Sequence, residues 1–138
     1  MADLSITAAN VIAAAGATLK SGTAGATVTA GQVVYLDTSD SKFKVADATD
    51  ANAYAAYGVA LNGASNGQPI DVCVKSNDLD IGATLTVGEV YVLSESGGIA
   101  PVGDLTTGDY AVVIGVANAT DSLRVNVNAD SRSDNTIA

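Results

Sequence analysis

The sequence predicts an all-β domain, a small barrel or sandwich built from two similar β units. One phrase occurs twice, as GATVTAGQVVYL at 25–36 and as GATLTVGEVYVL at 82–93, with an offset of 57 residues. An ungapped comparison of 25–60 with 82–117 gives 14 identical positions in 36, which indicates an internal duplication. Two copies are too few for a solenoid, so we expect the two units to close on each other. The repeated phrase and its surroundings contain six glycines for which we expect structural roles: Gly25, Gly31, Gly58, Gly82, Gly88 and Gly115.

Each unit is predicted to contain four strands. The first is a β-branched and aromatic run after a glycine, the second returns through a loop of turn residues, and the fourth alternates polar with apolar residues. We expect strands at 32–37, 42–47, 56–61 and 69–74 in the first unit, and at 89–94, 98–104, 110–117 and 122–127 in the second. Pro101 favours an edge or irregular position for its strand. One helical turn is compatible with 49–56.

The chain divides into three parts by composition. Residues 25–128 form the predicted β domain, with the duplication at 25–74 and 82–127, and residues 129–138 form a polar tail. Residues 1–24 lie outside the repeat, contain few charges, and are expected to form an extended N-terminal arm. The apolar residues that would anchor this arm on another protein are Leu4, Ile6, Val11 and Ile12. The alternatives are a frayed terminus or an extra strand of the same domain.

The apolar residues are mostly small. The chain has 25 Ala and 17 Val but only one Phe and no Trp. Because burial of an alanine removes little area from water, at roughly 25 cal/mol per Å², we expect a thin core. A thin core is easier to keep folded when neighbouring subunits cover part of it, so we expect a small homo-oligomer.

The charge balance limits the partners. Six Lys and Arg against fifteen Asp and Glu give a net charge of −9. Binding of nucleic acid depends on cations that neutralise phosphates, so DNA, RNA and anionic membranes are poor partners. No apolar run approaches the ~20 residues of a membrane span, and the N-terminal region has the wrong charge for a signal peptide. We therefore expect a product made in the cytoplasm without a targeting sequence.

The residues offer little chemistry. The chain has no His, and its single Cys73 is expected to be a packed thiol on the strand face opposite Val72. The carboxylate pairs Glu89 with Glu95 and Asp104 with Asp109 are formal acid–base candidates without an indicated pocket. Two acidic loops, Asp37-x-x-Asp40 and Asp78-x-Asp80, lack the spacing of a calcium loop. We expect no enzyme, no metal and no cofactor.

Several stretches of the sequence resemble one known family. These are GATLTVGEVYVLS at 82–94, GGIAPVGDLTTGDY at 97–110, and GVALNGAS at 58–65 followed by GQP. They are similar to the capsid decoration, or head cement, proteins of tailed bacteriophages, and the similarity extends over about residues 4–128. The family has no catalytic motif, so no single residue is diagnostic.

The resemblance implies a structural virion protein. Such a protein binds the major capsid protein on the outer surface of the head, stabilises the head, and is often a trimer whose N-terminal segment reaches onto the capsid. The alternative is a glycan- or receptor-binding module of a phage fibre, although the chain has few aromatic residues for that role.

Overall fold

The computed structural model describes residues 3–127, so the predicted polar tail at 129–138 lies outside the described residues. Within this range the chain is nearly all β, as the sequence predicts. The strands are β1 (Val11–Ile12), β2 (Thr18–Thr23), β3 (Val33–Asp37), β4 (Lys42–Val45), β5 (Ala56–Ala60), β6 (Pro69–Ile81), β7 (Val90–Leu93), β8 (Ile99–Pro101), β9 (Val113–Ala117) and β10 (Ser122–Asn126). The helical elements of the described range are the short 3-10 segments η1 (Ala8–Asn10), η2 (Glu95–Gly97) and η3 (Val102–Asp104).

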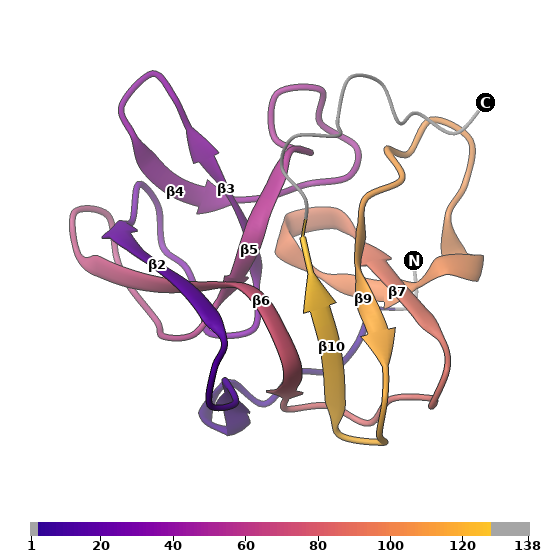
Figure 1. The fold of residues 1–138 in the computed structure, drawn as a ribbon. Helices are drawn as coiled ribbons and strands as arrows, with labels where there is room; N and C mark the ends of the chain where they lie inside the picture. The colour runs from indigo at the N-terminus through magenta and orange to yellow at the C-terminus, as the bar shows by residue number, and fades with distance from the viewer. Residues whose placement is uncertain (1–2, 128–138) are drawn as a thin grey trace.

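The ten strands form one antiparallel sheet that curls into a half-barrel (Figure 1). Its order is β4-β3-β5-β6-β10-β9-β7-β8, and β1 and β2 both pair with β6 outside this path. The expected closed barrel or sandwich is thus an open, curled sheet. Pro101 lies in β8 at one end of the order, where its missing N–H leaves no central ladder position unpaired.

The β3–β6 half and the β7–β10 half place their strands in the same order. In each half the first strand pairs with the second on one side and with the third on the other. The register also corresponds: the pairs are Val33–Val59 and Val34–Gly58 in one half, and Val90–Val116 and Tyr91–Gly115 in the other. Both ladders then shift by one residue at the next position. Each residue of the second set lies 57 positions after its counterpart.

Two of the three pairs of repeated glycines occupy matching positions. Gly31 and Gly88 have φ of +93° and +84°, and each donates its N–H at 2.8 Å to the last residue of a neighbouring strand, Ala60 or Ala117. At Gly58 and Gly115 a Cβ would meet the carbonyl oxygen of the adjacent strand, from Cys73 and Arg124 respectively.

The pair Gly25 and Gly82 differs between the copies. Gly82 has φ of +71° and its carbonyl accepts a hydrogen bond from the Thr7 N–H at 2.8 Å. Gly25 lies instead against the side chains of Lys42 and Lys44, where a Cβ would come within 2.9 Å and 2.8 Å.

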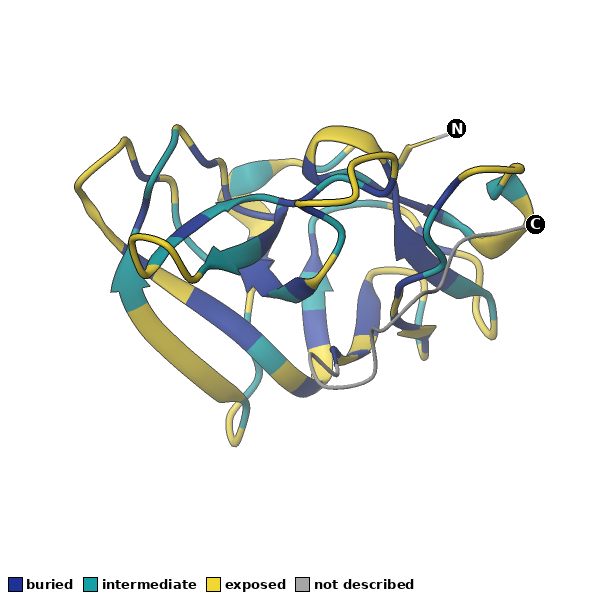
Figure 2. Ribbon diagram, turned by 90° about the horizontal axis from the view of Figure 1, so that it is seen from above, coloured by how far each residue is buried: buried dark blue, intermediate teal, exposed yellow. Residues whose placement is uncertain are grey.

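The buried side chains form two clusters, and the buried segments gather in the middle of the molecule (Figure 2). The smaller cluster lies in the first half and consists of Ala24, Val28, Val34, Phe43, Ala60, Ala64, Ile70 and Val72. The larger cluster draws on both halves, from Val33 and Val59 in the first to Ile114 and Leu123 in the second. Cys73 belongs to the larger cluster and Val72 to the smaller one, which confirms that they face opposite sides of β6.

Residues 3–24 lie against the β domain. The Leu4 N–H donates to the Ile99 carbonyl at 2.8 Å, and β1 and β2 pair with β6 along most of its length. Leu4 and Ile6 pack against the larger cluster and Val11 is 7% exposed, whereas Ile12 is 59% exposed. Of the four residues expected to anchor an extended arm, three are therefore held by the chain's own core, and the alternative of extra strands describes this conformation.

Candidate interaction surface

The cysteine and the acidic loops do not form a reactive centre. Cys73 is fully buried, and desolvation raises the pKa of its thiol to about 11, so the nucleophilic thiolate is scarce. Among residues 3–127 no group of three or more His, Cys, Asp or Glu side chains could hold a metal ion.

The structure places the four carboxylates of the two candidate pairs as follows. Glu89 precedes β7 and Glu95 follows it, at opposite ends of that strand. Asp109 is buried and accepts hydrogen bonds from the N–H and hydroxyl of Thr106 at 2.9 and 3.0 Å, so it closes the turn before β9. Asp104 lies in η3.

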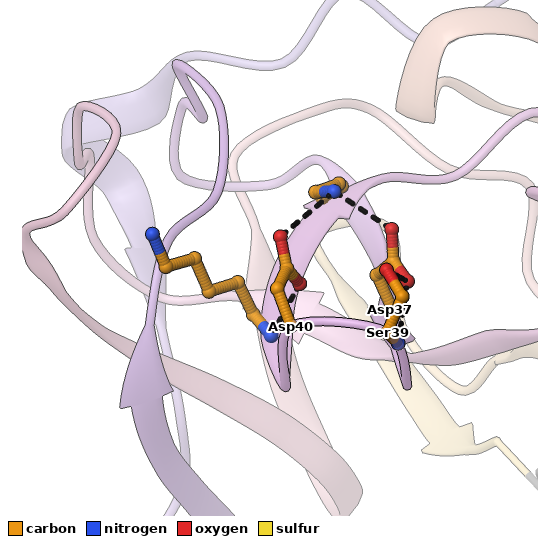
Figure 3. Close-up of polar contacts among 5 residues, drawn as sticks. Asp37, Ser39 and Asp40 are labelled. Carbon is orange, nitrogen blue, oxygen red and sulfur yellow. Dashed lines mark hydrogen bonds and ion pairs between the residues drawn. The ribbon is translucent and has the colours of Figure 1, made fainter.

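The hairpin between β3 and β4 is held by its own charges. Lys44 Nζ lies 2.7 Å from Asp37 Oδ2 and 3.1 Å from Asp40 Oδ2, so one ammonium group bridges two carboxylates (Figure 3). Hydrogen bonds from Lys44 and then from Ser39 hold the pKa of Asp37 well below its usual range, and the same carboxylates raise the pKa of Lys44. The first acidic loop of the sequence is therefore a closed ion-pair network on a hairpin.

The hairpin between β7 and β8 is held by the other half of the molecule. Its loop contains η2, and the Gly97 N–H donates to the Ala46 carbonyl at 2.6 Å. The Ser96 carbonyl accepts from Gln32 Nε2, and the Ser96 N–H donates to Asp47 Oδ2, both at 3.3 Å. Burial tends to raise the pKa of Asp47, but hydrogen bonds from Thr49 and Ser96 outweigh it and the net shift is downward.

Corresponding sheet positions in the two halves differ in exposure. We define the first-half face as Ala30, Val33, Ala56, Val59 and Cys73, all of which belong to the larger cluster and are at most 8% exposed. The residues at the corresponding positions define the second-half face, Val87, Val90, Val113, Val116 and Arg124. Val87, Val113 and Val116 are 59%, 51% and 39% exposed, and Arg124 is exposed beside them. The first-half face is thus covered, and the second-half face is open to solvent.

Two further exposed apolar side chains lie on the N-terminal strands, at separate positions along β6. Ile12 in β1 pairs with Asp80 and is 59% exposed, and Leu19 in β2 pairs with Cys73 and is 50% exposed. Ile12 also lines an open groove whose other walls are mostly polar, including Thr7, Asp80 and Asp121. Sequence reasoning identified Ile12 but missed Leu19 and the second-half face. One signal in the sequence could have identified this face. Cys73 pairs with Val59 in the first half, and the charged Arg124 pairs with the corresponding Val116 in the second half, which indicates an exposed position.

No protein-family model matches the chain, and no curated protein matches its sequence. Within the described residues, no helix has the length and apolar character needed to cross a membrane.

Proposed function

We propose that the chain is a duplicated β unit whose function is to bind other protein chains. The duplication is supported by the two halves, whose strand order, register and ladder shifts correspond at the offset of the sequence repeat. The observation that carries the binding function is the set of aliphatic side chains on ordered strands that the chain leaves uncovered. Exposed apolar surface of this kind, rimmed by polar residues, is typical of protein interaction sites.

The function that best fits is decoration of a tailed-phage capsid. The protein would bind the major capsid protein on the outer surface of the head as a small homo-oligomer, such as a trimer, and stabilise the head through many modest contacts. The sequence resemblance to decoration proteins supports this choice of partner. The net charge of −9 supports a location away from the packaged DNA.

Ile12 and Leu19 are the side chains best placed to contact the capsid. They belong to the N-terminal segment expected to reach the capsid, and they are its exposed large apolar residues within the described range. The other three apolar residues of the segment would hold it in place on the β domain, because they pack on the chain's own core: Leu4, Ile6 and Val11.

Co-sedimentation with heads tests the proposal. Heads of the phage that carries this sequence, prepared without the protein, would be mixed with wild-type chain, with an Ile12→Asp/Leu19→Asp double variant, and with Thr107→Asp as a matched control on a distant exposed loop. We expect full occupancy for the wild type and the control, and occupancy lowered at least about tenfold for the double variant. A wild-type chain that stays in the supernatant would overturn capsid decoration.

The alternative, a glycan- or receptor-binding module of a phage fibre, is less well supported. Sugar binding generally uses aromatic rings presented to the ligand. Tyr54 and Tyr110 stack on each other with ring centroids 3.9 Å apart, and both pack against the larger cluster. A copy number per particle that matches fibres instead of the capsid lattice would favour this alternative.

A further inference from the structure

We propose that the second-half face of one copy is covered by the β3–β4 hairpin of a second copy of this chain. The inference deepens the proposed function by naming one partner, and it rests on the proposed duplication rather than on capsid binding. Its argument begins with a contact that the chain already makes with itself.

Within one chain, the β7–β8 hairpin docks against the first half. Its tip, Ser96 and Gly97, bonds to Gln32, Asp47 and Ala46, and a Cβ at Gly97 would come within 2.8 Å of Val45 Cγ1. This docking lies beside the Val33 carbonyl, 3.1 Å from the same Cβ, and the first-half face itself packs with second-half residues such as Leu93 and Ile114 in the larger cluster. The second half of the molecule therefore covers one side of the first half.

Among residues 3–127, the corresponding hairpin tip and the corresponding face make no such contact. The β3–β4 hairpin is the counterpart of the docked β7–β8 hairpin, and the residues of its tip, Thr38 to Ser41, are all exposed. It projects on the side of the molecule away from β9 and β10 (Figure 1). The second-half face is exposed, and so is Val102, which follows the β8 residue that pairs with Tyr91. The β3–β4 hairpin and the second-half face thus correspond to the two surfaces that meet inside the chain, and both are exposed on the described part of the molecule.

The charges of the two surfaces allow this contact. Two copies with a net charge of −9 each repel each other over most of their surface. The hairpin has no formal net charge, since Asp37 and Asp40 are balanced by Lys42 and Lys44. The second-half face presents Arg124, and Glu89 precedes β7; Lys42 of the hairpin lies outside the ion pairs of Lys44 and would be the lysine to meet Glu89. Arg124, Glu89 and the four charged residues of the hairpin together carry no formal net charge, unlike the chain as a whole.

The contact has a defined symmetry. The hairpin and the face are different surfaces on different sides of the chain, so their association is head-to-tail and leaves one of each free on every pair. Because the hairpin projects away from β9 and β10, a dimer in which each hairpin meets the other copy's face is not formed, and the association closes as a ring of three or more copies or continues as a filament (Figure 1). A two-fold contact between two second-half faces would instead pair two surfaces that each carry Arg124.

Two variants, each with one blocked surface, test the proposal in solution and without capsids. Val116→Asp places a carboxylate in the second-half face, and Thr38→Trp adds bulk at the exposed hairpin tip. Sedimentation velocity at about 100 μM should show the wild type as an oligomer of three or more chains and each variant as a monomer, with the association constant lowered at least about 30-fold. An equal mixture of the variants should form a two-chain complex, because each variant retains the surface that the other has lost.

The controls separate this contact from misfolding and from capsid binding. Leu19→Asp, on an exposed apolar residue of β2, should leave the oligomer unchanged even if it abolishes binding to heads. Slow labelling of the buried Cys73 thiol verifies that each variant is folded. A monomeric wild type, a normal oligomer from either blocked variant, or a mixture that stays monomeric would each overturn the proposal.

Discussion

The β3–β6 half and the β7–β10 half of this chain differ most in what covers the two sides of their sheet. In the first half, one side packs in the smaller cluster and the other packs in the larger cluster. In the second half, Tyr91, Ala117 and Leu123 pack in the larger cluster, while Val113, Val116 and Arg124 on the other side are exposed. The two halves therefore have the same strand order but different exposed surfaces, because different parts of the chain pack against each of them.

The smaller cluster has a counterpart inside the larger one. Val28, Val34 and Ala60 correspond to Leu85, Tyr91 and Ala117 in register, and the latter three lie in the larger cluster. The larger cluster is therefore the core of the second half joined to the second buried side of the first half. This arrangement explains how a chain rich in alanine and valine builds a larger cluster that spans both halves.

The largest expected effect on stability comes from truncating one large buried side chain in each of the two clusters. Phe43 is 1% exposed in the smaller cluster, with its ring edge-on to Tyr57 at 5.2 Å, and Ile99 is fully buried in the larger one. We expect Phe43→Ala to lower the free energy of unfolding by about 3–5 kcal/mol and Ile99→Ala by about 2–5 kcal/mol. Both should retain a single urea transition, because the larger cluster spans both halves. Two separate transitions in Phe43→Ala would mean that the halves are independent.

An intermediate effect is expected at the paired glycines. A methyl group at Gly58 or Gly115 would meet the backbone carbonyl of Cys73 or Arg124, which cannot turn away as a flexible side chain could. Each Gly→Ala variant should lose about 1–3 kcal/mol of unfolding free energy in urea titrations. The matched control is Gly103→Ala, whose Cβ would meet nothing within 4 Å, and it should change stability by less than about 0.5 kcal/mol. A large loss at only one member of the pair would break the correspondence of the halves.

The smallest effect concerns the β3–β4 hairpin, whose ion pair makes its stability depend on pH, whereas the β7–β8 hairpin has no such ion pair among the described residues. The pKa of Asp37 is lowered in the folded chain, so its ion pair with Lys44 adds stability above the ordinary value of 3.8 and loses it as pH falls toward the folded value. Asp37→Asn should therefore be slightly less stable than the wild type at pH 7, and the difference should be smaller at about pH 2.5, because part of the linked stability is lost below the ordinary pKa. Urea midpoints at both pH values measure it. A difference that grows in acid would contradict the ion pair.

The hairpins of the fold were predictable from the sequence, because short-range signals define them. The β-branched runs and the turn residues between them predict β3 with β4 and β7 with β8, and the structure has both pairs. The helical turn at 49–56 was wrong. Side chains of Asp47 and Asp50 instead accept hydrogen bonds from N–H groups two residues later and form local turns, which compete with helix.

The long-range contacts could not be predicted, because they depend on which surfaces meet after the sheet curls. The sequence places Tyr35 and Tyr91 one register apart and suggests that one packs inside while the other is exposed. Both pack against the larger cluster, since that cluster touches opposite sides of the two halves. The docking of Leu4 and Ile6, and of the η2 loop, follows from the same curl and has no local signal.

The length of β6 has a consequence for how the chain reaches its native state. This strand pairs with β2 before it in sequence, with β10 near the end of the described chain, and with β1 and β5 as well. During synthesis its partner at residues 122–126 emerges only after β7, β8 and β9, so the β6 edge that β10 covers stays unpaired until those strands have been made. Folding dominated by such distant pairings is slow, and the nascent chain is exposed to wrong partners for the same interval.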